Sequence, residues 1–260
     1  MTTLLIDVGN TALKWTTVDE PDNPHTIVHK GSTHFKEELY ELWLKMRPEK
    51  VIGCTVAAPV VAFSLTKFFN DHDIQWNWVR SQATFSGKVI VNNRYARPTQ
   101  LGADRWYAAV GATDALYPDN ESLLVVHTGT ATTVDSIVKK SDGTFDFVGG
   151  RIAPGPSLMK DSLIKGIPSL PDAAGYYNVF PGCTNEAIIT GIVDAQVGLI
   201  LRAQHIMLQK GMAPKVVLAG GAAQFIAPYL SEEITDLVVK HNLVLHGLAA
   251  LAREQEKNRQ

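Results

Sequence analysis

The sequence has few cysteines and no excess of charge of either sign, and both shortages exclude classes of protein. Only two cysteines, Cys54 and Cys183, occur in 260 residues, which argues against a disulfide scaffold and is typical of a reducing cytosol. The 24 basic and 26 acidic side chains give a net charge of −2, so no nucleic-acid partner is expected. We therefore expect a cytoplasmic protein.

Long hydrophobic runs and several common motifs are also missing. The most apolar stretch, residues 186–208, is interrupted by Asp194 and Arg202, and a membrane span needs about 18 uninterrupted apolar residues. The first residues lack a basic segment and include Asp7, unlike a signal peptide. We expect no membrane partner. The chain has neither a Gly-x-x-x-x-Gly-Lys-Ser/Thr loop nor a Gly-x-Ser-x-Gly elbow, and its eight histidines lack metal-ligand spacing.

The composition that remains is that of a globular α/β protein. Hydrophobic residues make up 45% of the chain and charged residues 19%, enough for a sizeable core without disulfides. Hydrophobic periodicity and turn residues predict the elements of the first half. They are strands at 4–6, 12–18, 26–30, 51–56, 76–80 and 88–91, and helices at 35–46, from Pro59, and at 101–116. In the second half they predict strands at 122–127, 132–139, 144–152, 215–219 and near 236–239, and helices from Gly155, at 185–210, after Gly221 and at the end, with a loop over 166–183.

An internal echo is the most informative pattern. Residues 4–11 (LLIDVGNT) match residues 124–131 (LVVHTGTA): each has three apolar residues, a polar residue, any residue, a glycine, and then small polar or small residues. Each copy opens a predicted three-strand meander. A single repeat of this length predicts two similar lobes, 1–117 and 118–260, rather than a solenoid. Two such turns on facing lobes suit the binding of a polyphosphate.

The first copy carries residues suited to phosphate. Gly9 lets the backbone approach a ligand, Asn10 and Thr11 add neutral donors, and Lys14 supplies a positive charge. Asp7 can hold Mg²⁺ directly or through water. An ordinary hairpin with Asp and Asn as turn formers is the alternative interpretation. The second copy, residues 129–133, has small hydroxyl residues after its glycine, which suit phosphate oxygens, and strand propensity of β-branched residues is the alternative. The pairs Gly149–Gly150, Pro154–Gly155 and Gly220–Gly221 are further places where the backbone could approach a nucleotide, although glycine pairs usually mark turns.

Asp104 and Arg105 interrupt an otherwise apolar, alanine-rich segment at the start of a predicted helix. A carboxylate there can take the proton of a hydroxyl substrate, and a guanidinium can bind its oxyanions. The alternative is an acidic residue that merely favours the positive end of the helix dipole.

Together these motifs resemble those of the type III pantothenate kinases, also called Bvg accessory factor-like proteins. The resemblance covers the whole chain and rests on six strings in the same order. They are Asp7-x-Gly9-Asn10-Thr11-x-x-Lys14, Tyr95-x-x-Pro98-x-x-Leu101-Gly102-Ala103-Asp104-Arg105-Trp106, Gly129-Thr130-Ala131-Thr132, Gly149-Gly150-x-x-x-Pro154-Gly155, Thr184-x-Glu186-Ala187-x-x-x-Gly191 and Gly220-Gly221.

The resemblance implies a fold, a reaction and a set of site residues. The fold is that of the actin, hexokinase and acetate kinase superfamily (ribonuclease H-like), with two similar lobes and the active cleft between them. The reaction is ATP-dependent phosphorylation of pantothenate to 4′-phosphopantothenate, the first step of coenzyme A synthesis, by a homodimer with its substrate pockets at the subunit interface. It implies Asp104 as general base and Asp7 as the Mg²⁺ residue; ATP contacts from Asp7, Val8, Gly9, Asn10, Thr11, Ala12, Leu13, Lys14 and Thr130; and pantothenate contacts from Tyr95, Gly102, Ala103, Asp104, Arg105 and Thr184.

One position departs from the family pattern. His127 stands where the family usually has an aspartate that helps to bind a monovalent cation, K⁺ or NH₄⁺, and histidine is a poor ligand for K⁺. The resemblance therefore leaves the ligands of that cation unassigned. Two other functions stay open at this point: another small-molecule kinase of the superfamily, and a regulatory protein that keeps the fold without catalysis. The presence of both Asp7 and Asp104 speaks against the second.

Overall fold

The computed structural model describes residues 2–33, 35, 37–116, 121–172 and 174–258, and the chain divides by packing into two compact units. Unit 1 comprises residues 1–120, 140–147 and 242–260, and unit 2 comprises residues 121–139 and 148–241. The predicted lobe boundary between residues 117 and 118 lies outside the described residues. The C-terminal segment packs in unit 1, so the units are not two consecutive halves of the sequence.

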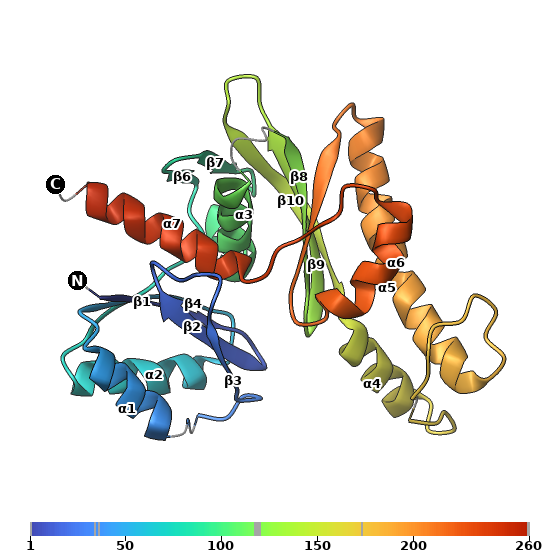
Figure 1. The fold of residues 1–260 in the computed structure, drawn as a ribbon, viewed down its shortest axis with the longest axis horizontal. Helices are drawn as coiled ribbons and strands as arrows, with labels where there is room; N and C mark the ends of the chain where they lie inside the picture. The colour runs from blue at the N-terminus through green and yellow to red at the C-terminus, as the bar shows by residue number, and fades with distance from the viewer. Residues whose placement is uncertain (1, 34, 36, 117–120, 173, 259–260) are drawn as a thin grey trace. The chain divides into compact units, whose positions relative to one another are not determined.

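Unit 1 is built on a five-stranded sheet with the order β3-β2-β1-β4-β5. β1, β2 and β3 form the predicted antiparallel meander, and β4 and β5 extend the sheet in parallel with β1. Two helices cover one face of this sheet (Figure 1), and Trp43, Leu65 and Phe69 from them pack against Leu4 and Ile6 of β1. The elements are β1 (Thr3–Val8), β2 (Ala12–Thr17), β3 (His25–Val28), α1 (Glu37–Met46), β4 (Lys50–Thr55), α2 (Pro59–Asp71) and β5 (Gln75–Trp78).

A pair of closely packed helices completes unit 1. Figure 1 shows α7 (red) crossing α3 (green). A Cβ at Gly111 of α3 would run into the carbonyl oxygen of Leu243, and one at Gly247 of α7 would run into that of Tyr107. The backbones therefore touch, which fixes the start of α3, where Asp104 lies. The elements are β6 (Thr84–Ser86), β7 (Ile90–Asn93), the 3₁₀ turn η1 (Pro98–Gln100), α3 (Ala103–Ala115) and α7 (Leu243–Lys257).

Unit 2 has a second sheet, in which the strands follow the order β12-β11-β8-β9-β10. β8 pairs antiparallel with β9 and parallel with β11. The core between the sheet and helices α5 and α6 contains Leu124, Val126, Ile200, Leu218 and Ile226. The elements are β8 (Ser122–Thr128), β9 (Ala131–Lys139), β10 (Phe145–Pro154), α4 (Pro156–Gly166), α5 (Thr184–Gln209), β11 (Pro214–Ala219), α6 (Ala223–Glu233) and β12 (Val238–Val239). The first residues of β10, Phe145–Phe147, belong to unit 1, where they pair with β7.

Both sheets therefore place their strands in the same order: third, second, first, fourth and fifth in the sequence of each repeat. The echo between residues 4–11 and 124–131 extends to the whole topology, which confirms the predicted α/β fold of two similar lobes.

Two local predictions need correction. The helix predicted from Leu101 begins at Ala103, because η1 precedes it and Gly102 is extended, with a ψ of 135°. The strand Thr84–Ser86 was not predicted, since three residues are too few to show alternation. Within the described ranges, no helix is both long enough and apolar enough to span a bilayer.

Candidate active site

The turn between β1 and β2 holds the first phosphate-type loop. The Gly9 amide donates to the carbonyl oxygen of Ala12 at 3.0 Å, and the amides of His29 and Lys30 both donate to the carbonyl oxygen of Thr11 at 2.9 Å. Asn10 and Thr11 at the tip are exposed. Backbone hydrogen bonds within the loop and from residues 29 and 30 therefore fix its conformation, while its tip remains accessible to a ligand.

The register of β1 and β2 places Asp7 directly opposite Lys14, and the parallel pairing of β1 with β4 places Cys54 beside Asp7. The Cys54 thiol donates to Oδ1 of Asp7 at 3.6 Å. On the other side of the hairpin, Nζ of Lys14 donates to Oδ1 of Asn242 at 3.0 Å. One cluster therefore contains the carboxylate of Asp7, the ammonium group of Lys14, the thiol of Cys54 and the amide of Asn242.

The carboxylate of Asp7 lies in an unfavourable environment for a negative charge. Burial, and then the negative charge of Asp104, raise its pKa from 3.8 to about 6, although Lys14 and the Cys54 thiol act in the opposite direction. Burial also raises the pKa of the Cys54 thiol well above its usual value, so the thiol stays protonated and can donate. The carboxylates of Asp7 and Asp104 are therefore close enough to repel each other electrostatically. A bound cation would reduce this repulsion.

This donor set fits Mg²⁺ bound together with nucleotide phosphates. Mg²⁺ takes oxygen ligands and keeps several waters, so it needs only one or two protein carboxylates when phosphates supply the rest. Asp7 provides such a carboxylate in a partly buried position. Among the described residues no group of three or more His, Cys, Asp or Glu side chains could hold a metal ion alone.

The start of α3 presents Asp104 and anchors Arg105. Oδ1 of Asp104 accepts a hydrogen bond from the Arg105 amide at 2.8 Å. The buried Arg105 donates from Nη1 to the hydroxyl of Tyr95 at 3.1 Å, and its guanidinium lies over the rings of Tyr95 and Phe147 at 5.9 and 5.8 Å from their centroids. A Cβ at Gly102 would lie 2.5 Å from Oδ1 of Asp104, so only glycine leaves that carboxylate its position.

The segment before α3 is held rigidly, which fixes Tyr95 and Gly102. Nδ2 of Asn93 donates to the carbonyl oxygens of Gln82 and Pro98, each at 3.1 Å, and Oδ1 of Asn93 accepts from the Tyr95 amide at 3.1 Å. The hydroxyl of Ser81 donates to the carbonyl oxygen of Leu101 at 2.7 Å. The buried polar side chains thus order an otherwise irregular segment.

In unit 2, the turn between β8 and β9 is one residue tighter than its counterpart. Thr128 pairs with Thr132, whereas Val8 pairs with Leu13. The Gly155 amide donates to the carbonyl oxygen of Thr130 at 2.9 Å, and a Cβ at Gly155 would collide with the carbonyl oxygen of Gly129. Glycine is therefore required where the second loop meets the start of α4.

A fully buried glutamine supports the same loop. Oε1 of Gln196 accepts from the hydroxyl of Thr132, and Nε2 donates to the carbonyl oxygen of Pro154 at 2.9 Å. Nearby, Gly220 has a φ of 102°, and a Cβ there would collide with the carbonyl oxygen of Thr128. The strand end that carries the second loop therefore packs against backbone on both sides.

The structure thus gathers many of the predicted site residues within unit 1. Asp7, Lys14 and Asp104 lie in one electrostatic cluster, and Tyr95 contacts Arg105. Unit 2 contains Thr130 in the second loop, His127 near the end of β8 and Thr184 at the start of α5. Sequence reasoning missed the contacts of Cys54, Asn242 and Gln196. Their partners are 47, 228 and 64 residues away, so no local pattern signals them.

Comparison with known proteins identifies related sequences over nearly the whole chain. The family model of type III pantothenate kinase matches residues 3–205. A type III pantothenate kinase of Paracidovorax citrulli is 34% identical over 262 residues, covering 98% of this chain and 99% of that protein. One of Janthinobacterium sp. (strain Marseille) is 37% identical over 263 residues and covers 96% of each chain.

Solved structures share the fold at low sequence identity. A Baf family protein of Campylobacter jejuni has a TM-score of 0.56 at 20% identity, covering 98% of each chain. The activator of the 2-hydroxyisocaproyl-CoA dehydratase of Clostridium difficile, solved with bound ADPNP, has a TM-score of 0.54 at 14% identity, covering 100% of this chain and 96% of that one. Together with the doubled topology, these neighbours show the two-lobed, actin-like fold.

Proposed function

The chain belongs to the type III pantothenate kinase family, and from this membership we propose how its residues perform the reaction. It is a kinase that phosphorylates pantothenate with ATP in coenzyme A synthesis. The observation that carries the proposal for the site is the cluster of Asp7, Lys14 and Asp104 in unit 1. The cluster contains the positively charged ammonium group of Lys14, which suits phosphate, and two carboxylates. Asp7 lies on β1 and Asp104 at the start of α3.

Asp104 is the general base of this proposal. The hydrogen bond from the Arg105 amide orients its carboxylate, whose second oxygen takes the proton of the pantothenate 4′-hydroxyl. The hydroxyl oxygen forms a bond to the γ-phosphorus of ATP as the bond from that phosphorus to the β,γ-bridging oxygen breaks, and ADP leaves. Arg105 and Tyr95, which are joined by a hydrogen bond, line the pantothenate pocket with Gly102 and Ala103. From the family membership we also assign Thr184 to pantothenate binding.

The β1–β2 loop binds the phosphates of ATP. The backbone of residues 8–13, with the exposed side chains of Asn10 and Thr11, offers donors, and Lys14 adds a positive charge. From the family membership we also assign Thr130 to ATP binding. Asp7 holds Mg²⁺, which supplies neutralisation of the phosphate charge when bound. A cytoplasmic location is part of the proposal and is supported by the free cysteines Cys54 and Cys183.

A substrate competition assay tests this function. Purified protein is incubated with ATP, Mg²⁺ and an equimolar mixture of pantothenate, acetate and glucose, and the phosphorylated products are separated by mass. We expect 4′-phosphopantothenate as the dominant product. Acetyl phosphate or a sugar phosphate as the main product would assign the chain to another small-molecule kinase of the same fold.

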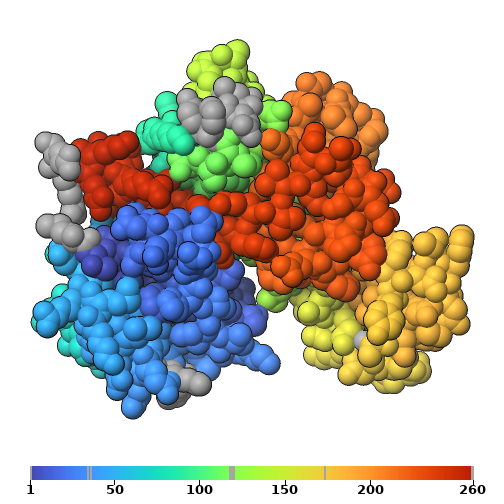
Figure 2. Space-filling model, viewed as in Figure 1, coloured from blue at the N-terminus to red at the C-terminus, as the bar shows by residue number. Residues whose placement is uncertain are grey.

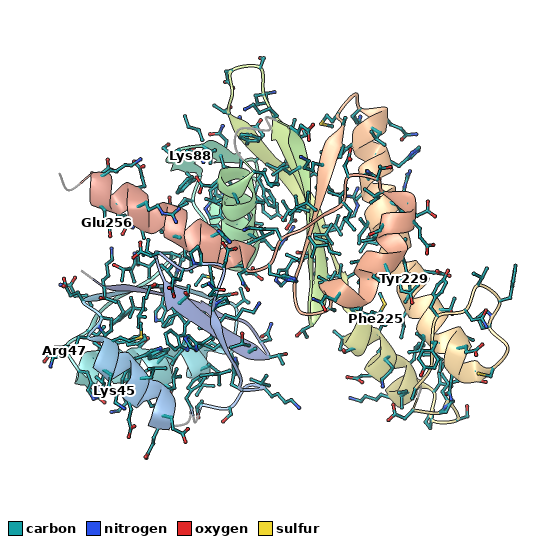
Figure 3. The ribbon with its side chains drawn as sticks, viewed as in Figure 1. Lys45, Arg47, Lys88, Phe225, Tyr229 and Glu256 are labelled. Carbon is teal, nitrogen blue, oxygen red and sulfur yellow. The ribbon has the colours of Figure 1, made fainter. Side chains whose placement is uncertain are left out.

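We also propose that the chain forms a homodimer through α4 and the loop that follows it. Leu158 of α4 is 43% exposed, and Tyr176 and Phe180 of the loop are each 86% exposed. Figure 2 shows the loop (yellow) standing at one end of unit 2. Tyr177 of this loop contacts Tyr229 of α6, with the ring centroids 4.5 Å apart and the ring planes tilted by 41°. Figure 3 labels Tyr229 on this side of α6. A loop that contacts its own unit and still exposes large apolar side chains is typical of an interface.

Light scattering measures the mass directly. We expect twice the 28.4 kDa mass of one chain. We expect Phe180→Asp to shift the protein to a monomer, because each protomer of a symmetric dimer would then bury one negative charge in the interface. Phe63→Asp is the matched control, since Phe63 is 69% exposed on α2 of unit 1 and should leave the mass unchanged. An unmodified protein that is monomeric and active at assay concentration would contradict the proposal.

His127 leads to a prediction about monovalent cations. It is next to last in β8, opposite Thr133 of β9. Imidazole has an unperturbed pKa of about 6.5, so a protonated His127 beside bound ATP could supply the charge that K⁺ or NH₄⁺ supplies to relatives with aspartate. We expect full activity in sodium or Tris buffer without K⁺ or NH₄⁺, and we expect His127→Asp to introduce a dependence on either cation.

A K⁺ titration of the unmodified protein is the check. Strong activation by K⁺ would contradict the replacement and would favour a site rebuilt from the buried Asp135 or from backbone carbonyl groups. His127→Asn is the control variant. It removes the charge without adding a carboxylate, so it should lower activity without creating a cation dependence.

A further inference from the structure

Lys14 is held by a residue from the far end of the chain. Its Nζ donates to Oδ1 of Asn242 at 3.0 Å, and the two residues are 228 positions apart in sequence. Nδ2 of Asn242 donates in turn to the backbone carbonyl of Asp22, at 3.3 Å, in the turn between β2 and β3. An ammonium group only donates and a carbonyl only accepts, so the two neighbours allow a single orientation of the Asn242 amide.

The backbone of Asn242 is also fixed. It caps the start of α7 in the left-handed conformation, with φ 58° and ψ 31°, and its carbonyl oxygen accepts from the His246 amide at 3.1 Å. One helical turn on, Nε2 of His246 lies 2.9 Å from Oδ1 of the same Asp22 whose carbonyl faces Asn242. The start of α7 and the turn at Asp22 therefore hold the amide from two sides.

The chemistry of this acceptor suits a lysine that must bind a further anion. A lysine side chain has four rotatable bonds, so an ammonium in one place needs a partner. A carboxylate partner would neutralise the charge, whereas an amide oxygen orients the ammonium and leaves its charge available. Within the described ranges, no ion pair with a carboxylate is found for Lys14 at bonding distance, although its charge lowers the pKa of Asp7.

We propose that Asn242 is a positioning residue of this kinase: it holds the ammonium group of Lys14 in place for the nucleotide phosphates without neutralising it. The proposal rests on the role of Lys14 in binding ATP phosphates. Asn242 acts through Lys14 and touches no substrate itself.

Two substitutions separate the amide from the backbone conformation. Glycine and aspartate both tolerate the left-handed region. Asn242→Gly therefore keeps the turn and deletes the amide, while Asn242→Asp keeps the turn and the shape and adds a negative charge beside Lys14. Asn242→Gly should raise the KM for ATP about three- to tenfold, as expected for one lost hydrogen bond, with kcat changed less. Asn242→Asp should raise it further, because the ion pair competes with phosphate.

The affinities for ATP, ADP and adenosine, measured by calorimetry in the full-length protein, separate positioning from a structural role. We expect both variants to lose affinity for ATP and ADP and to bind adenosine as the unmodified protein does. In a Lys14→Ala background, Asn242→Gly should have no further effect on ATP binding. If Asn242→Gly does not fold, Asn242→Asp carries the same prediction.

Four results would overturn the proposal. An equal loss of affinity for ATP and adenosine would show a general structural role, and so would an undiminished effect of Asn242→Gly in the Lys14→Ala background. Unchanged ATP affinity in Lys14→Ala alone would instead locate the failure in the role proposed for Lys14. A loss in Lys14→Ala with none in either Asn242 variant would leave the phosphate role of Lys14 intact and remove Asn242 from it.

Discussion

Replacing Asp104 with asparagine is expected to reduce turnover by about 10²–10⁴-fold, the range typical of a lost general base, while the affinity for ATP stays nearly unchanged. Asparagine has almost the same shape and can still accept the 2.8 Å hydrogen bond from the Arg105 amide, so the start of α3 should keep its geometry. It cannot accept the proton of the hydroxyl substrate. Steady-state kinetics together with ATP binding by calorimetry check both parts.

Asp71→Asn is the matched control for this variant. Asp71 is an exposed carboxylate at the end of α2, in an ion pair with Lys67, and surface pairs of this kind contribute little. The control should keep full turnover. Near-normal turnover in Asp104→Asn would remove Asp104 from the chemical step, and a parallel loss of ATP binding would make its role one of charge or structure.

Replacing Asp7 with asparagine is expected to lower activity by about 10²–10³-fold, as when one preorganised electrostatic contact is removed, and at the same time to stabilise the free protein. The gain follows from the raised pKa of Asp7. The pKa of this carboxyl is 3.8 in the unfolded chain and about 6 in the folded protein. Keeping it ionised in the folded state therefore costs free energy above pH 6, by about 1–3 kcal/mol, and nothing below pH 4, where both states are protonated.

Thermal unfolding without metal or nucleotide measures this effect. Asp7→Asn should unfold at a higher temperature than the unmodified protein at pH 7.5, and the difference should shrink as the pH falls from 6 towards 4. Adding Mg²⁺ and ATP should stabilise the unmodified protein more than the variant, because the variant lacks the ligand. A stability gain of the same size at all pH values, or no gain at pH 7.5, would contradict the assigned environment of Asp7.

The sequence predicted most of the fold because its signals are local and repeated. Three apolar residues, a polar residue and a glycine turn occur twice, and each copy sets the first strand of a sheet with the same order. Pro59 at the first position of α2 and Gly211 after α5 mark helix ends through backbone chemistry alone. The packing of α7 against α3 in unit 1 has no such signal, since it depends on glycines 136 residues apart.

In the candidate site, too, the contacts with a local sequence signal could be predicted and those that depend on tertiary packing could not. The pairing of Asp7 with Lys14 follows from a hairpin, and Asp104 and Arg105 are neighbours, so their combination could be predicted. The tertiary contacts could not. Cys54 reaches Asp7 only because β4 pairs with β1, and Asn242 reaches Lys14 only because α7 returns to unit 1. The pKa of Asp7 also depends on burial, which no short sequence pattern specifies.

The most direct measurement is the stoichiometry of one reaction. Purified protein with ATP, Mg²⁺ and pantothenate is followed for ADP and, by mass spectrometry and phosphorus NMR, for the position of the transferred phosphate. We expect one 4′-phosphopantothenate for each ADP, and a loss of both products together in Asp104→Asn. ADP formed without phosphopantothenate, or ATP bound with no product at all, would contradict it.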